Sequence, residues 1–197
     1  MKTKIVFILD RSGSMVNIAS DVIGGFNQFL KEQKEVKGKA TLTVILFDDV
    51  YEVLINDVDI QDVNPLTEKE YFARNYTALW DAVGKTITTV KESAKKRDKI
   101  LVFINTDGVE NASREFTPVT VKALVEETRK LGWNYVFIGA NIDSFSVGGM
   151  MGINLTANYS PTASGTRSIY TTMSNATTTL RQSTKSSLDS SDLNGIK

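Results

Sequence analysis

The chain has 197 residues, of which 41% are hydrophobic and 23% charged, a composition typical of one compact domain with a sizeable core. Its 23 basic and 23 acidic residues balance, so it lacks the positive charge expected of a protein that binds nucleic acid or an anionic membrane. It contains neither Cys nor His, which excludes thiol and imidazole chemistry and leaves the oxygen ligands that Mg²⁺ and Mn²⁺ prefer.

The first expected strand is Ile5–Leu9, an apolar run close to the start of the sequence. Asp10 and Arg11 end this run after five residues, which is too short for a secretory signal or a membrane span. No later run approaches the length of a membrane span. We therefore expect a cytoplasmic protein with no membrane partner.

Four further apolar runs have the length of strands and are rich in β-branched and aromatic residues, which favours strand over helix. They are Thr41–Phe47, Tyr51–Ile55, Ile100–Asn105 and Asn134–Ile138. Most are apolar at nearly every position, as expected when helices cover both faces of a parallel sheet. Only three residues separate Phe47 from Tyr51, too few for a parallel crossover, so these two strands are predicted to form a hairpin.

The segments between the strands carry apolar residues at helical spacing, each forming a single stripe. The stripes are Ile18, Val22, Phe26 and Phe29; Leu79, Val83, Ile87 and Val90; and Val121, Leu124, Thr128 and Leu131. Pro118 suits the first turn of the third helix, and Gly132 suits its C-terminal end. This alternation predicts a doubly wound, Rossmann-like α/β fold with a mostly parallel sheet and one antiparallel edge strand.

The C-terminal segment Thr156–Lys197 differs in composition from the rest of the chain. It contains 18 Ser or Thr and only 6 charged residues among 42. Apolar residues at helical spacing still predict one more helix, from about Thr162 to Arg181. We therefore expect a single domain over residues 1–182 and a disordered tail over 183–197, where no apolar periodicity remains.

The residues that follow the strands carry the functional signal, because ligands of an open α/β sheet bind beyond the carboxyl ends of its strands. Positions 10, 12 and 14 place a carboxylate and two hydroxyls in one small volume after the first strand. A second carboxylate follows the strand that ends at 105, and a third hydroxyl precedes the second helix. This set suits octahedral coordination of Mg²⁺ or Mn²⁺. The predicted metal ligands are Asp10, Ser12, Ser14, Thr77 and Asp107.

Three motifs fall in order on these elements: Asp-x-Ser-x-Ser after an apolar strand, Thr-Ala-Leu at a helix start, and Thr-Asp-Gly after a later strand. This pattern resembles the von Willebrand factor A (VWA) domain and its metal ion-dependent adhesion site (MIDAS), over roughly residues 4–140. The resemblance implies that Ser12 and Ser14 bind the metal directly. It implies that Asp10, Thr77 and Asp107 bind directly or through water, and that an acidic side chain of a protein partner takes the open position.

Two features set this chain apart within the resemblance. Asn75 and Tyr76 stand where the family usually has glycine before the threonine, so this loop is expected to turn less tightly. The segments Phe137–Asn141 and Gly165–Arg167 resemble small stand-alone bacterial and phage members.

Other polar residues near the strand ends have simpler explanations. Asp48 and Asp49 are interpreted as turn residues of the hairpin, and Glu110 and Asn111 as solvated loop residues. Each metal-site motif taken alone also fits an ordinary turn or helix cap, and only their combination favours a metal site. Both tryptophans are interpreted as packing residues.

The favoured function is a non-enzymatic protein-binding module whose metal captures an acidic residue of a partner. The alternative is a metal-dependent hydrolase of the phosphatase type, in which Asp10 attacks phosphate. Serine at position 12 and the lack of His leave that mechanism without a general acid. A structural domain with a vestigial site is the third possibility, and the sequence leaves the partner and the oligomeric state open.

Overall fold

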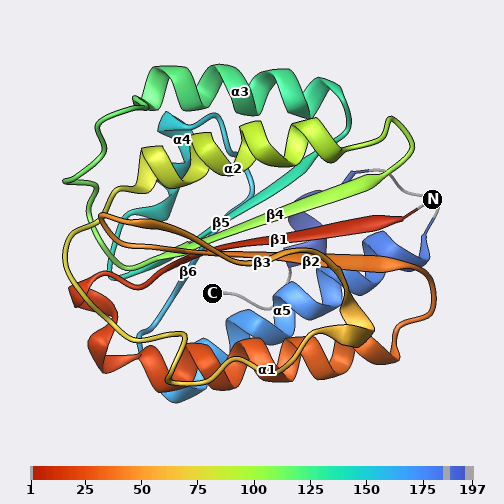
Figure 1. Cartoon of the computed structure of the whole chain (residues 1–197), viewed down its shortest axis with the longest axis horizontal. Helices are drawn as coiled ribbons and strands as arrows, with labels where there is room; N and C mark the ends of the chain where they lie inside the picture. Colours follow the sequence, from red (N-terminus) through yellow and green to blue (C-terminus); the bar gives the residue numbers. More distant parts are fainter. Residues whose placement is uncertain (1, 184–186, 194–197) are drawn as a thin grey trace.

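The computed structural model describes residues 2–183 and 187–193, in which six strands form one sheet of order β3-β2-β1-β4-β5-β6 (Figure 1). The strands are β1 (Thr3–Asp10), β2 (Ala40–Phe47), β3 (Tyr51–Asp59), β4 (Lys99–Thr106), β5 (Asn134–Ala140) and β6 (Thr156–Tyr159). All neighbours run parallel except β3, which pairs antiparallel with β2 at one edge. The predicted fold class and hairpin are thus confirmed, and β6 is an additional strand that the sequence analysis did not predict.

The central strands are buried along their whole length, which explains their almost continuous apolar sequence. Alternate residues of β1 face opposite sides of the sheet. Phe7 and Leu9 belong to one hydrophobic core, whereas Val6 and Ile8 belong to the other. The sheet therefore separates two apolar layers, each of which needs helices to cover it.

Helices cover both faces, as Figure 1 shows. On one face lie α1 (Ala19–Glu35) and α5 (Ala163–Gln182), and on the other lie α2 (Leu79–Ser93), α3 (Pro118–Lys130) and α4 (Ser144–Met150). The predicted helix boundaries hold at both ends of α3, where Pro118 occupies the first turn and Gly132 adopts a φ of 90° after the last. In the described part of the chain, no helix is both long and apolar enough to span a bilayer.

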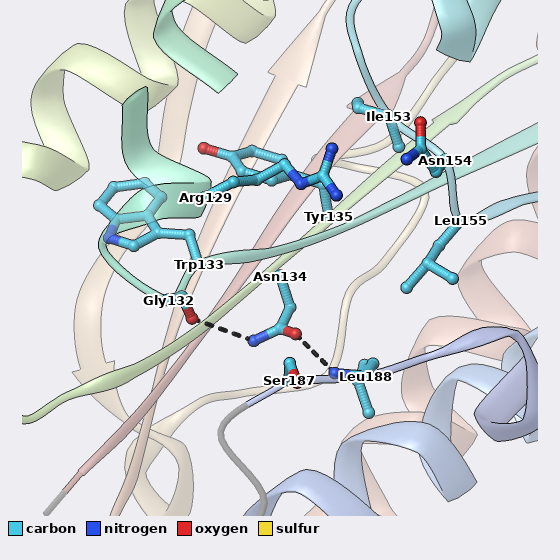
Figure 2. A pocket seen from close by; sticks show the side chains of 10 residues that line it. All are labelled: Arg129, Gly132, Trp133, Asn134, Tyr135, Ile153, Asn154, Leu155, Ser187 and Leu188. Atoms are coloured by element: carbon cyan, nitrogen blue, oxygen red, sulfur yellow. Dashed lines mark hydrogen bonds between the residues drawn. The ribbon is translucent and has the colours of Figure 1, made fainter. Parts of the chain in front are cut away.

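Part of the C-terminal segment packs against the domain. The Leu188 N–H donates to Asn134 Oδ1 at 2.7 Å, beside a cavity of about 230 Å³ at the start of β5 (Figure 2). Leu188 and Leu193 are buried in the core on the α1 and α5 side. Within the predicted disordered tail, 183–197, Leu188 and Leu193 are therefore buried, and residues 184–186 and 194–197 lie outside the described residues.

Candidate metal centre

The candidate centre begins where β1 ends, at the carboxyl edge of the sheet, opposite to the cavity of Figure 2. Asp10 is the last residue of β1, and its side chain is fully buried. Its Oδ1 accepts the Ser12 N–H at 2.6 Å, and its Oδ2 accepts the hydroxyl of Thr106 at the end of β4. Because β1 and β4 are parallel neighbours, their carboxyl ends bring Asp10 close to the loop that carries Asp107.

Three hydroxyls and the second carboxylate meet at the same point. Ser12 Oγ lies 3.2 Å from Ser14 Oγ, and Ser14 Oγ donates to Asp107 Oδ1 at 2.5 Å. A Cβ atom at Gly108 would lie 2.8 Å from Thr77 Oγ1, 3.3 Å from Ser14 Oγ and 3.4 Å from Ser12 Oγ. The structure therefore brings all five predicted ligand residues together, and glycine at position 108 leaves their hydroxyls room to converge.

Burial makes this cluster of carboxylates costly without a cation. Desolvation raises the pKa of Asp10 to about 6, against hydrogen bonds from Thr106 and Ser12 that lower it, and the charge of Asp107 raises it further. Burial also raises the pKa of Asp107, although the Ser14 hydroxyl opposes the shift. A divalent cation would favour the ionised form of both groups.

The loop that carries Thr77 is held by backbone hydrogen bonds to its neighbours. Gly13 N–H donates to the Asn75 carbonyl at 3.1 Å, and Arg74 N–H donates to the Arg11 carbonyl at 2.8 Å. Asn75 has a φ of 51°, a left-handed conformation that Asn tolerates better than most residues. The expected loosening of this loop is therefore absent, because Asn75 makes the turn that glycine usually makes.

A buried ion-pair cluster beneath these loops was missed by the sequence analysis. Asp48 is fully buried, and its Oδ2 accepts hydrogen bonds from the Arg74 side chain and from Arg11 Nε, the latter at 3.3 Å. Arg11 is 1% exposed and also donates to Glu52 Oε2 at 2.6 Å. Asp48 does make the predicted turn, since its Oδ1 accepts the Val50 N–H at 2.6 Å. Its other oxygen also joins the segments that carry Arg11 and Arg74.

Glu110 and Asn111 also do more than the predicted solvated loop residues would. The Glu110 carboxylate accepts the N–H groups of Trp80, Ala112 and Ser113 at 2.7–3.1 Å. Asn111 Oδ1 accepts the Thr77 N–H at 2.9 Å. Both residues thereby fix the start of α2 and the orientation of Thr77. The only sequence feature that pointed to a role for Glu110 and Asn111 is their position, two and three residues after the Thr106-Asp107-Gly108 motif.

The donor set of this site contains more hydroxyls than carboxylates. Across the described residues, no group of three or more His, Cys, Asp or Glu side chains is arranged to hold a metal ion. A metal at this point would depend on two carboxylates and three hydroxyls. These are hard oxygen donors, which suit Mg²⁺ and Mn²⁺.

Comparison with known proteins places this geometry in a known fold. No family model and no curated protein matches the sequence. Among solved structures, proximal thread matrix protein 1 from the mussel byssus, with a zinc-occupied MIDAS motif, is similar at a TM-score of 0.59 and 16% identity, over 89% of this chain and 48% of that chain. The chain has the VWA-type fold.

Two further structures have the same fold. A von Willebrand factor type A protein from Catenulispora acidiphila gives a TM-score of 0.64 at 14% identity, over 88% of this chain and 42% of that chain. The SpRpn10 VWA domain gives 0.66 at 10% identity, over 88% of this chain and 95% of that domain. This chain spans less than half the length of the mussel and Catenulispora proteins.

Proposed function

We propose that this protein is a metal-dependent protein-binding module of the MIDAS type. The observation that carries the proposal is the convergence of the Ser12, Ser14 and Thr77 hydroxyls on Gly108, next to Asp107. Asp10, Ser12, Ser14, Thr77 and Asp107 would hold Mg²⁺ or Mn²⁺. A bound divalent ion would supply an electrophilic centre for an anionic oxygen, and an Asp or Glu side chain of a partner matches it.

The residues present fit a divalent cation in charge and in shape. Two carboxylates balance the charge of such an ion, while uncharged hydroxyls donate weakly and leave affinity for a further anion. The Gly108 position keeps open the space into which the hydroxyls point. Burial raises the pKa of Asp10 and of Asp107, and a bound cation would oppose this shift by favouring the ionised carboxylates.

The surroundings of the site support binding rather than hydrolysis. The buried Asp10 has both oxygens in hydrogen bonds, which disfavours attack on phosphate. Asp48 is committed to two arginines and to a backbone N–H, and Glu110 to backbone N–H groups. Neither carboxylate is available as a general base, which a hydrolase would need close to its water.

The finer assignments rest on the sequence patterns. We propose a small stand-alone protein of the bacterial or phage type, located in the cytoplasm, on the strength of the Phe137–Asn141 and Gly165–Arg167 resemblance and the short apolar runs. These assignments do not affect the chemistry of the site.

Calorimetric titration of the chain with Mn²⁺, after removal of metal with EDTA, tests the proposal. We expect one site that is lost in Ser14→Ala and kept in Ser168→Ala, an exposed serine of α5. Thermal unfolding should show stabilisation by Mn²⁺ and Mg²⁺, because a ligand of the folded state stabilises it by mass action, and less by Ca²⁺, which prefers more oxygen ligands. Unchanged melting curves, or metal-dependent phosphatase activity that disappears in Asp10→Asn, would contradict the proposal.

A further inference from the structure

Most of the highly exposed large apolar side chains of the described residues lie at one edge of the molecule. Six of them exceed 60% exposure. Five lie in segments that follow the carboxyl ends of strands or begin the next helix, and the sixth, Leu131, lies at the opposite edge. They are Phe145 (77%), Val109 (75%), Val119 (75%), Tyr76 (66%), Val16 (63%) and Leu131 (62%).

Four of these side chains lie at the carboxyl edge of the sheet, which also carries the candidate metal centre, and we name them the apolar rim: Val16, Tyr76, Val109 and Phe145. Val16 lies two residues after Ser14, Tyr76 directly precedes Thr77, and Val109 lies two residues after Asp107. Hydrogen bonds tie the first three segments together, through Gly13 N–H to the Asn75 carbonyl and Asn111 N–H to the Thr77 carbonyl. Phe145 opens α4, which follows β5, the neighbour of β4.

The rim is large enough to bind a peptide or loop and too small for an obligate interface. At these exposed fractions, the four side chains together present roughly 500 Å² of largely apolar surface, a size at which patches on monomers are often functional. A stable protein dimer buries about 800 Å² on each partner. A single extended segment of a partner protein therefore matches this surface better than a broad face.

The preference for an acidic partner comes from the metal and not from the charged side chains of this edge. Arg11 and Arg74 pair with Asp48 and Glu52. The exposed Asp49 and Asp143 also follow carboxyl ends of strands, so the side chains alone do not make this edge basic. A metal at the centre would supply the positive charge that attracts a carboxylate.

We infer that the apolar rim selects partners whose metal-binding Asp or Glu is flanked by large apolar side chains. This inference rests on the proposed function, because the metal would hold the carboxylate while the rim buries its neighbours. A tenfold preference corresponds to about 1.4 kcal/mol of binding free energy. Full burial of one large apolar side chain against the rim contributes at least this much.

Fluorescein-labelled hexapeptides test the inference by anisotropy in Mn²⁺. One peptide carries a central Glu flanked by Leu and Phe, one a Glu flanked by Ser and Asn, and one a Gln flanked by Leu and Phe. We expect the first to bind about tenfold more tightly than the second. Val109→Ser and Phe145→Ser should each reduce this preference, and the control Leu131→Ser, which is also more than 60% exposed but lies at the opposite edge, should keep it.

The outcomes separate the rim from the metal site. Equal affinity for both Glu peptides, or an effect of Leu131→Ser as large as that of Val109→Ser, overturns the inference even where calorimetry shows bound Mn²⁺. Equal binding of the Gln peptide, unaffected by EDTA, contradicts metal capture while the apolar preference stands. Sedimentation that shows a dimer dissociated by Val109→Ser would assign the rim to a second copy and overturn the proposed partner.

Discussion

The ion pair beneath the metal loops allows the sharpest prediction, which is that Asp48→Asn destabilises the fold. The substitution keeps the size of the side chain and removes the charge that faces Arg11, whose side chain is 1% exposed. Loss of one partner from a buried ion pair costs about 3–5 kcal/mol. Arg11 would keep Glu52 Oε2 at 2.6 Å and the Glu70 carbonyl at 3.3 Å, so we expect the lower limit, about 3 kcal/mol.

Urea unfolding followed by circular dichroism in EDTA measures this loss without any contribution from metal. In thermal unfolding of a chain of this length, the same loss of about 3 kcal/mol would lower the melting temperature by roughly 6–12 °C. The adjacent Asp49→Asn is the matched control, since Asp49 is exposed and should change stability by less than about 0.5 kcal/mol. A loss below about 1 kcal/mol in Asp48→Asn, or equal losses in both variants, would refute the assignment of Asp48 as the residue that joins the loops.

Three further predictions concern the metal centre itself. In EDTA, the free energy of unfolding should fall as pH rises from about 4 to about 6, because burial raises the pKa of Asp10 to about 6 and the unfolded state loses this proton at lower pH. Asp10→Asn should flatten the pH profile measured by urea unfolding. An unchanged profile would refute Asp10 as the source of the pH dependence. Asp107→Ala should abolish Mn²⁺ binding in calorimetry and keep the native circular dichroism spectrum, whereas an unfolded variant would assign Asp107 a structural role. Gly108→Ala should weaken Mn²⁺ binding by about tenfold, since its Cβ would lie 2.8 Å from Thr77 Oγ1. Gly24→Ala should leave the affinity unchanged, because its Cβ would meet no atom within 4 Å. Equal effects of the two substitutions would contradict this geometry.

The main fold was predictable because its signals are local. Long apolar runs predicted the central strands, and the short connection after Phe47 predicted that β3 pairs antiparallel with β2. β6 and α4 were missed for a physical reason. β6 has only four residues, and α4 has seven, two of them glycines that lower helix propensity, so both form through packing against β5 rather than through their own sequence preference.

The proximity of the five candidate ligand residues was also predictable, because parallel strands end at the same edge of a sheet and bring their following loops together. The groups that hold those loops were not. Arg11 and Asp48 are 37 positions apart, and their sequence neighbours do not indicate that they pair. A turn explained Asp48 completely at the level of sequence, because one carboxylate oxygen does serve the turn while the other receives the arginines.

These supports imply how the centre would respond to a ligand. The segments that carry Ser12, Thr77 and Asp107 are joined by contacts within the protein, which are the backbone hydrogen bonds of Gly13 and Asn111 and the ion pairs of Asp48. Loops that are already ordered lose little conformational entropy when a ligand binds, so most of the binding free energy appears as affinity. Metal binding should therefore change the electrostatics of the buried Asp10 and the half-buried Asp107 more than it changes the backbone, and the surface around Gly108 should have the same shape before and after the cation arrives.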